Sequence, residues 1–499
     1  MQRMPKFRAL ACGFAVLVFA GAPLVLAQQR PDLVLEGLIT DADALKYKEV
    51  PFTVPEGVVR LGVEFNYTGR EQRTTIDLGI GDPVRFRGWS GGNKAAFTLA
   101  TTDATPSFLP GPILPGRWYL ILGVPNIREN VKSQFTAKIY FERRGDKSTF
   151  LSAPLRTGAA WYRGDLHMHT GNSDGSCRSQ SGVRVPCPVF KTVQAAVERG
   201  LDFIAITDHN TNSQFEMMRE LQPYFDRVLL IPGREITTFH GHANVFGAVD
   251  FIDFRLGSEH VPDLAALEDE VERAHGVLSI NHPTSPSGEP CMGCGWTVRD
   301  TDFRRIQAVE VVNADRVEGE NSGIPFWEGL LNRGLRITAV GGSDNHDADK
   351  PPSQPGSVGY PETVVHAENL TQEAILDAIR AGHVYLDLEG STNRLLEYTA
   401  ETARQKADMG DALEAKRDES IQLSVHVANV GGGSLELIED GRPLAASEFA
   451  EKKIGENGAN SYHSSYHWTS DGARHWLRIV VRTPSGKPVL LGNPIFINF

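Results

Sequence analysis

The feature that most constrains the fold is an alternation of strand-like and helix-like segments between about residues 158 and 387. Stretches with helical periodicity precede short apolar stretches with strand character in three clear cases: VQAAVERG then LDFIAITDH, LAALEDEVERAHG then VLSINHP, and FWEGLLNRG then LRITAVGGSD. Repeated β/α units of this kind form a parallel sheet or a barrel. The carboxyl ends of the strands then share one rim, which is where α/β barrels build their active sites.

Polar side chains follow these strands at the point where each strand ends. The candidate metal-binding residues, in chain order, are His167, His169, Asp174, His209, Glu235, His242, His282, Asp344 and His346. A single histidine at a strand end is more often structural. Buried imidazoles and carboxylates are unfavourable unless they are paired or coordinate an ion, so this many of them on one rim indicate a metal site.

The donor types narrow the choice of metal. Nitrogen and oxygen donors without nearby thiolates suit Zn²⁺, Mn²⁺ or Fe. There are more donors than one ion takes, so we expect two or three divalent ions that share a bridging carboxylate. Asp165 and Asp208 directly precede or adjoin ligand positions, and we interpret them as partners that orient the imidazoles.

The segments on either side differ from the middle. Residues 28–150 carry short alternating stretches such as VVRLGVEFNY and FTAKIYFER, broken by glycine and proline, a pattern typical of a β-sandwich. Residues 391–499 contain strand-like stretches such as SIQLSVHVAN and HWLRIVVRT and predict a small β domain. The chain of 499 residues is long enough for several domains, and the α/β domain is expected over residues 155–390.

The N-terminus has the pattern of a secretory signal peptide. Arg3, Lys6 and Arg8 precede an apolar stretch that ends in VLA at Ala27, so residues 1–27 are expected to be removed by cleavage. No later stretch is long and apolar enough to span a bilayer. We therefore expect a secreted protein, in the bacterial periplasm or outside the cell, without a stable membrane anchor.

Four cysteines follow the expected signal peptide: Cys177, Cys187, Cys291 and Cys294. Disulfides persist in exported proteins, and three pairings are possible. The CMGCG motif is also a C-x-x-C of the kind that binds zinc, although no second C-x-x-C completes a four-sulfur site. All four cysteines lie in two loops inserted on the ligand-bearing rim, where we expect disulfides to stiffen the mouth of the pocket.

The order of the motifs resembles that of the PHP (polymerase and histidinol phosphatase) superfamily. D-L-H-x-H-T, S-D-G, T-D-H, G-x-E, G-H, N-H-P and G-S-D-x-H follow one another within about residues 158–390. GDLHMHT, GHANVFG and GGSDNH, with β domains on both sides and an export signal, look most like the carbaryl-hydrolase (CehA/McbA) branch. The resemblance implies a distorted seven-stranded (β/α)7 barrel.

The resemblance also implies how the ligands are shared among the ions. One ion would be held by His167, His169, Glu235 and Asp344; Glu235 would bridge to a second ion held by His242 and His282; a third ion would be held by Asp174, His209 and His346. Many relatives have a histidine one residue after Asp174, where this chain has Gly175. The residues expected to be catalytic are Glu235, Asp344 and His346.

This donor set predicts a hydrolase of ester bonds. Clustered metal ions lower the pKa of bound water and neutralise charge that develops on the attacked group. No serine or cysteine with a neighbouring base stands out, so we expect direct attack by metal-bound hydroxide. The first expectation is a phosphoesterase, which should place Arg or Lys beside the metals. The alternative is a carbamate or carboxylic ester hydrolase, which should line its site with Phe and Trp.

The hypothesis from another functional class is a non-catalytic protein, whose β domains bind polysaccharide and whose barrel is a scaffold. It predicts gaps among the ligand positions, and the sequence shows none. The formal net charge of −12 argues against nucleic acid as a partner, because phosphate backbones attract surfaces rich in Lys and Arg. The expected partner is a small-molecule ester.

Overall fold

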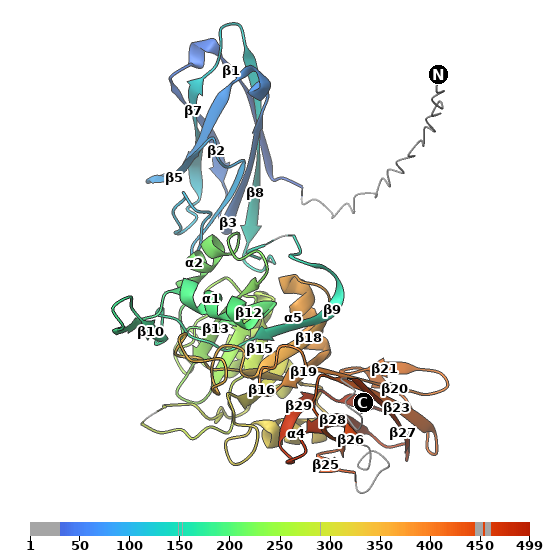
Figure 1. Cartoon of the computed structure of the whole chain (residues 1–499). Coiled ribbons are helices and arrows are strands. Elements are labelled where there is room, and N and C mark those ends of the chain that lie inside the picture. Colours follow the sequence, from blue (N-terminus) through green and yellow to red (C-terminus); the bar gives the residue numbers. More distant parts are fainter. Residues whose placement is uncertain (1–29, 148, 152, 290, 445–452, 455–460) are drawn as a thin grey trace, which may run out of the picture.

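The computed structural model describes residues 30–147, 149–151, 153–289, 291–444, 453–454 and 461–499. The expected signal peptide and its cleavage site lie outside the described residues. Figure 1 shows a multidomain, strand-rich chain with an N-terminal β region, a middle region that contains the α-helices, and a C-terminal β region. Within the described residues, no helix is both long and apolar enough to cross a membrane.

The N-terminal region consists of two antiparallel four-stranded sheets that share one core. The first has the strand order β1 (Leu33–Thr40), β8 (Lys132–Arg143), β3 (Val58–Tyr67), β6 (Ala96–Ala100). The second has the order β2 (Tyr47–Val54), β7 (Gly116–Asn126), β4 (Thr75–Gly81), β5 (Phe86–Gly91). Alternate residues of β8 are buried, as expected of a strand with one face on a core. Trp118 and Phe135, from different sheets, both belong to that core.

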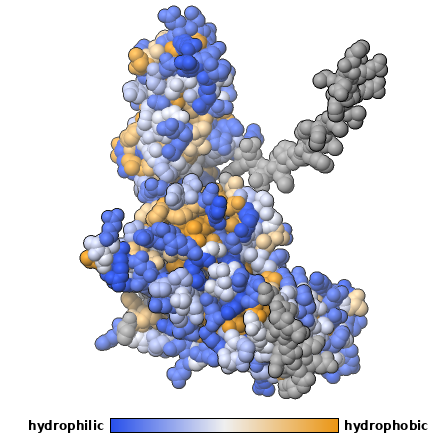
Figure 2. Space-filling model, in the orientation of Figure 1, coloured by the Kyte–Doolittle hydropathy of each residue, from blue (hydrophilic) through white to orange (hydrophobic). Residues whose placement is uncertain are grey.

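A buried ion cluster joins the N-terminal sheets to the middle region. Arg60 of β3 donates hydrogen bonds of 2.7 and 2.6 Å to the two carboxylate oxygens of Asp103. Arg219, in helix α2 (Gln214–Leu221), donates to the same carboxylate at 2.6 Å. Burial would raise the pKa of Asp103, but the two guanidinium groups outweigh it and lower the pKa. Figure 2 shows apolar residues among hydrophilic ones on the surface where these regions meet.

The middle region is built on one mixed sheet. Its strand order is β17–β16–β15–β14–β13–β12–β9–β18–β19. The bounds are β9 (Thr157–Asp165), β12 (Phe203–Ile206), β13 (Leu229–Thr237), β14 (His242–Phe246), β15 (Val277–Ile280), β16 (Ala308–Asn313), β17 (Thr338–Gly342), β18 (Glu362–Asn369) and β19 (Val384–Asp387). Strands β9, β12 and β13 are parallel, as are β15, β16 and β17. Strands β14, β18 and β19 are antiparallel to their neighbours.

The expected (β/α)7 barrel is not confirmed. Among the described residues no backbone ladder joins β17 to β18 or β19. Instead, Thr363 of β18 exchanges side-chain hydrogen bonds with the backbone of Gly341 in β17, and Asn493 bridges the backbones of β17 and β19. The connection from β15 to β16 contains a 3-10 turn (Phe303–Arg305) in place of an α-helix. Antiparallel neighbours such as β13 and β14 need no crossover helix, so the β/α alternation is interrupted.

Five α-helices lie in the described residues and pack against this sheet: α1 (Val189–Arg199), α2, α3 (Leu264–Arg273), α4 (Ile324–Asn332) and α5 (Gln372–Ala381). Local sequence explains several of their ends. Asp263 and Thr371 cap α3 and α5, because each side chain accepts a hydrogen bond from a backbone N–H of the first turn. Gly200 and Gly382 end α1 and α5 with left-handed φ angles of 75° and 79°, which glycine adopts without steric penalty.

The C-terminal strands continue the middle sheet. Strand β29 (Pro488–Gly492) pairs with β19, and the sheet extends through β28 (His475–Arg482), β24 (Gly433–Glu439), β25 (Arg442–Pro443), β26 (Lys453–Ile454), β30 (Ile495–Ile497) and β22 (Ala412–Leu413). A separate sheet has the order β21 (Lys406–Asp408), β20 (Leu395–Glu401), β23 (Ser420–Ala428), β27 (Ser461–Thr469). Their shared core also includes Val364 of β18 and Tyr385 of β19, so the middle and C-terminal regions are packed together.

Candidate metal centre

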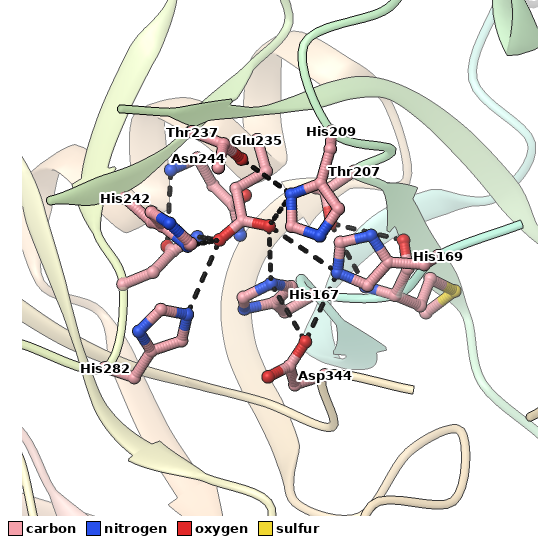
Figure 3. A network of polar contacts seen from close by, with 12 residues as sticks. His167, His169, Thr207, His209, Glu235, Thr237, His242, Asn244, His282 and Asp344 are labelled. Atoms are coloured by element: carbon pink, nitrogen blue, oxygen red, sulfur yellow. Dashed lines mark hydrogen bonds and ion pairs between the residues drawn. The ribbon is translucent and has the colours of Figure 1, made fainter. Parts of the chain in front are cut away.

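The residues at the ends of successive strands converge on Glu235 (Figure 3). Glu235 lies in β13 and His242 begins β14, whereas the other ligand candidates follow β9, β12, β15 and β17: His167, His169, Asp174, His209, His282, Asp344 and His346. His167, His169, Glu235, His242 and His282 are each at most 5 % exposed. The strands end at a common edge, which is why residues so far apart in the sequence meet there.

Two of these positions have an unusual backbone. His282 and Asp344 adopt positive φ angles of 26° and 50°, which are uncommon for residues other than glycine. Each follows directly or closely on the end of a sheet strand, β15 or β17. Such backbone conformations cluster at functional sites, and here they turn the chain at the rim where the ligand candidates gather.

The first ligand group contains His167, His169, Glu235 and Asp344. The Nε2 atoms of His167 and His169 lie 3.5 and 3.6 Å from Glu235 Oε2. The same two atoms lie 3.4 and 3.2 Å from Asp344 Oδ1. Two imidazole nitrogens and two carboxylate oxygens therefore face one point. The atoms of His167, His169 and Glu235 lie close enough together to share one metal ion, and Asp344 lies as close to His167 and His282.

The second ligand group uses the other oxygen of Glu235. His242 Nδ1 lies 3.2 Å and His282 Nε2 lies 3.5 Å from Glu235 Oε1. Asn281 holds this oxygen in place, since its side-chain amide donates to it at 2.9 Å. Because Oε2 faces the first group and Oε1 the second, the carboxylate of Glu235 has the arrangement of a bridge.

The third ligand group is more open to solvent. His346 Nε2 lies 3.3 Å from Asp174 Oδ1, and His209 Nε2 lies 3.8 Å from Asp174 Oδ2. His169 lies within reach of the same group. The Asp174 side chain is 58 % exposed. A Cβ on Gly175 would lie 2.4 Å from the carbonyl oxygen of His169, so this backbone has no room for a side chain at position 175.

The donor atoms themselves test whether metal ions fit. Among the described residues, His167 Nε2 and His169 Nε2 are buried polar atoms without a hydrogen-bond partner. Leaving such atoms unsatisfied is unfavourable by about 1–3 kcal/mol each. The buried Glu235 Oε2 that they face has an ion-pair contact of 2.9 Å with His209 Nδ1. The two Nε2 atoms and Glu235 Oε2 face the same point, and nitrogen and carboxylate oxygen are suitable donors for Zn²⁺, Mn²⁺ and Fe. The residues present therefore fit divalent cations.

The charges of the cluster compensate one another. Burial would raise the pKa of Glu235, but the surrounding imidazoles, His167 above all, outweigh it and hold the pKa well below its usual range. Burial would likewise raise the pKa of Asp344, but the nearby imidazoles, His167 above all, hold this pKa well below its usual range. Burial would lower the pKa of His346, but its hydrogen bond to Asp174 dominates the opposing effects, which raise the pKa to about 9. The carboxylates thus favour positive charge around them.

Glu310, which is not among the residues predicted from the sequence, supports the ligands from behind. Glu310 is 2 % exposed in β16, and its Oε1 accepts a hydrogen bond from His167 Nδ1 at 2.9 Å. Its Oε2 accepts from the backbone N–H of His282 at 2.9 Å. Nearby, Asn313 donates to Asp344 at 3.1 Å. The available signal was an acidic residue in the middle of the apolar stretch AVEVV.

The interpretation of Asp165 and Asp208 as partners of the imidazole rings was wrong. Asp165 accepts hydrogen bonds from the backbone N–H groups of His167, Ser343 and Gly359. Asp208 accepts from the backbone and hydroxyl of Thr170 and from the hydroxyl of Ser173. Both carboxylates are buried, and backbone and hydroxyl donors reach them first, so they shape the ligand-bearing loops rather than the rings.

The four cysteines of the described residues form two disulfides, Cys177–Cys187 and Cys291–Cys294. In the first, Cys177 lies in the short strand β10 (Ser176–Arg178) and Cys187 directly follows the short strand β11 (Arg184–Pro186). The backbone N–H of Gly171 donates to the carbonyl of Cys187 at 2.7 Å, so this loop adjoins the segment that carries Asp174. The second disulfide closes a loop beside His242 and His282.

No family model matches the chain. An uncharacterized protein of Methanocaldococcus jannaschii is 29 % identical over 164 residues, which are 32 % of this chain and 85 % of that protein.

Two solved structures resemble the chain distantly. A two-domain protein of Bacteroides vulgatus, described as containing a predicted PHP-like metal-dependent phosphoesterase, aligns with a TM-score of 0.40 and 18 % identity over 70 % of this chain and 99 % of that one. A candidate metal-dependent phosphoesterase of Bifidobacterium adolescentis aligns with a TM-score of 0.29 and 18 % identity over 43 % of this chain and 94 % of that one. These scores are too low to assign a fold or an activity to this chain. What the site defines is a class: a multidomain, strand-rich protein with a buried cluster of histidines and carboxylates that fits several metal ions.

Proposed function

We propose that this protein is a multinuclear, metal-dependent phosphoesterase of the PHP type. The observation that carries the proposal is the carboxylate of Glu235, whose two oxygens face different sets of imidazoles. Oε1 faces His242 and His282, whereas Oε2 faces His167 and His169 and also lies 2.9 Å from Nδ1 of His209. The ligands would be His167, His169, Glu235 and Asp344 for one ion, Glu235, His242 and His282 for a second, and Asp174, His209 and His346 for a third. The order of the sequence motifs supports the same assignment.

The metal ions would supply Lewis acidity and lower the pKa of a coordinated water. The protein itself supplies orientation, since Asn281 fixes one oxygen of Glu235 and Asn313 one oxygen of Asp344. The cysteines of the described residues are all in disulfides, so none of them offers a free thiol as a nucleophile. This fits hydrolysis without a thioester or thiophosphate intermediate.

Arg316 favours a phosphate ester as the substrate. Its guanidinium donates to the hydroxyl of Ser285 at 2.8 Å, and the backbone N–H of Ser285 donates to the carbonyl of His282 at 2.9 Å. Arg316 is half-buried, and within the described part of the chain no carboxylate forms an ion pair with it. An arginine without an acidic partner, one side chain away from a ligand candidate, is suited to bind a phosphate oxygen.

A second candidate function is hydrolysis of a carbamate or carboxylic ester. Two large apolar side chains are exposed near His242: Phe239 is 77 % exposed and Met292 is 55 % exposed. Such residues could contact an aryl leaving group. Both candidate substrates would use the same ligand groups.

We also propose that the protein is exported. The basic residues, apolar stretch and VLA of its N-terminus are the first support. The second is the pair of disulfides in loops beside the ligand residues, because disulfides persist in oxidising compartments.

The function is tested with substrates that share one leaving group. Protein of measured metal content would be assayed with p-nitrophenyl phosphate, bis(p-nitrophenyl) phosphate and p-nitrophenyl N-methylcarbamate. We expect the phosphate esters to be hydrolysed, a chelator to abolish the activity, and Zn²⁺ or Mn²⁺ to restore it. The Arg316→Ala variant should have a KM for the phosphate ester about tenfold or more higher, since a hydrogen bond to a charged group contributes roughly 1.5–3 kcal/mol.

The matched control is Arg299→Ala, which removes an exposed arginine from the neighbouring loop. It should leave kcat and KM for the phosphate ester unchanged. Faster turnover of the carbamate, together with a loss of that activity in Phe239→Ala, would establish the second candidate instead. Full activity toward all three substrates after chelation would exclude a metal-dependent mechanism.

A further inference from the structure

We propose that the loop Cys291–Cys294, closed by its own disulfide, is a positioning element that selects which ring nitrogen of His242 and of His282 faces the second metal ion. The inference deepens the proposed function and rests on it, because it concerns how two ligands of that centre are presented. It assigns to the C-x-x-C motif a role in holding histidine ligands.

Two backbone carbonyls of this loop contact the two imidazoles. The Nδ1 atom of His282 lies 3.0 Å from the carbonyl oxygen of Cys294, and the Nε2 atom of His242 lies 3.4 Å from that of Met292. A carbonyl oxygen only accepts hydrogen bonds, so each of these nitrogens carries the proton. The lone pairs that remain are on Nε2 of His282 and Nδ1 of His242.

Those lone pairs are the ones that face Glu235. His282 Nε2 and His242 Nδ1 lie 3.5 and 3.2 Å from Glu235 Oε1. The two histidines therefore present opposite ring nitrogens to the same point, although both belong to one ligand group. A hydrogen bond on the far side of a ligating imidazole fixes its tautomer and its orientation, and here a single loop provides both bonds.

The loop is anchored to the two segments that carry these histidines. On one side, Gly293 has a φ of 79° and packs so closely that a Cβ would lie 2.1 Å from the carbonyl oxygen of Thr238. On the other side, the backbone N–H of Trp296 donates to the carbonyl of Pro283 at 2.9 Å. The disulfide closes the loop around Gly293, and Trp296 anchors the chain just after it, which restricts where the two carbonyls can lie.

In the first ligand group, the imidazole of His167 is supported differently. His167 is held by the carboxylate of Glu310, which belongs to a strand of the sheet. The ring partners of His242 and His282 instead lie in the connection between β15 and β16, outside any sheet strand. The disulfide therefore closes covalently a segment whose position, unlike that of Glu310, is not set by a sheet strand.

The experiment compares metal binding by the full-length protein and its Cys291→Ala/Cys294→Ala variant. Alanine is used because free thiols beside His242 could themselves bind a metal ion. Metal-free protein would be titrated with Co²⁺ and followed by its visible absorption, which reports the ligand geometry, and bound metal would be counted by elemental analysis. We expect one ion to bind about 10–100-fold more weakly in the variant, as for other partners of metal ligands, and its absorption band to change.

Two further variants show whether the effect is specific. The His282→Ala variant already lacks a ligand of the second ion. Removing the disulfide from this variant should not lower its affinity for any of the remaining ions. The Cys177→Ala/Cys187→Ala variant opens a larger loop, of sequence separation 10 against 3, and so should destabilise the fold at least as much, yet the Co²⁺ absorption of the second ion should stay unchanged.

The outcomes separate the inference from the proposed function. If the wild-type protein binds several ions and the Cys291→Ala/Cys294→Ala variant binds them equally tightly, the positioning role is wrong and the metal centre stands. The positioning role is also wrong if the variant weakens an ion in the His282→Ala background, since the effect would then be a general loosening. Wild-type protein that binds no divalent metal would overturn both.

Discussion

Glu310 illustrates at the residue scale how one carboxylate can support two ligand groups. It accepts hydrogen bonds from His167 Nδ1, from the backbone N–H of His282 and from Asn313, at 2.9, 2.9 and 3.2 Å. The bond to His167 leaves Nε2 of that ring free to face Glu235. The bond to the backbone of His282 holds the chain where it leaves β15.

We predict that Glu310→Gln weakens metal binding by about 10–100-fold, the usual effect of losing the partner of a ligating histidine. The glutamine amide keeps the shape of the side chain but turns one acceptor into a donor. The amide N–H group of the glutamine would then face another donor, either the ring N–H of His167 or the backbone N–H of His282, and one hydrogen bond would be lost. Equilibrium titration with Zn²⁺ measures the change.

The control for this substitution is Glu198→Gln on the exposed face of α1, which should bind metal as the wild type does. Unchanged metal affinity in Glu310→Gln would show that the tautomer of His167 is set by other contacts. Thermal unfolding of the metal-free variant separates an effect on metal binding from an effect on folding.

At the scale of elements, the ends of β9, β16 and β17 approach so closely that only glycine fits at one position. A Cβ on Gly342, the last residue of β17, would lie 2.3 Å from the Cβ of His167 and 2.6 Å from Glu310 Oε1. His167 follows β9 and Glu310 belongs to β16. The close approach of three strands is therefore what brings the first ligand group to its position.

We predict that Gly342→Ala lowers the free energy of unfolding of the metal-free protein by roughly 1–3 kcal/mol, the range found for overpacking, and also weakens metal binding because His167 must move. The matched control is Gly329→Ala in α4, where an added Cβ would meet nothing within 4 Å. That change should stabilise the helix by about 0.5–1 kcal/mol. Chemical denaturation of both variants gives the comparison, and equal stability of the two would contradict the steric argument.

At the scale of the whole molecule, one sheet runs from the middle region into the C-terminal strands through β18, β19 and β29. A group of buried charges lies at this junction: Arg163 of β9 pairs with Glu362 of β18 and with Asp387 of β19. Glu362 Oε1 is buried without a hydrogen-bond partner. Burial, followed by the charge of Asp387, raises the pKa of Glu362 to about 7, although Arg163 opposes the shift.

This raised pKa predicts a dependence of stability on pH. The usual pKa of the group is 4.5, so between about pH 4.5 and 7 the unfolded chain releases a proton that the folded protein retains. The free energy of unfolding contributed by Glu362 is therefore highest below this range, falls as the pH rises through it, and stays low above it. Glu362→Gln should remove this dependence on pH. Its free energy of unfolding should exceed that of the wild type by roughly 1–3 kcal/mol between pH 5 and 8.

The measurement is urea denaturation of the wild type and the variant at several pH values. Only the difference between them is used, because every other ionisable group is the same in both proteins. Glu368→Gln, an exposed position of the same strand, is the control and should follow the wild type. A constant difference between Glu362→Gln and the wild type across this pH range would mean that Glu362 does not titrate there.

By itself, the sequence determined which side chains could meet at the rim. The helices α1, α3 and α4 and the strands that follow them were predictable from hydrophobic periodicity, because amphipathic spacing is a local property. The positions of His167, His209, His282 and Asp344 just after strands were predictable for the same reason. Their convergence then required only that the strands end at one edge. Their roles as metal ligands, and the activity, stay predictions.

Only the tertiary structure decided how the surrounding groups are paired. The partner of His167 is Glu310, 143 residues away, and the choice among three cysteine pairings depended on which thiols the folded loops bring together. The antiparallel insertion of β14 and the extension of the sheet through β29 are also long-range pairings. Such contacts join distant segments and produce no periodic pattern in the sequence of either segment. They were therefore defined only by packing in three dimensions.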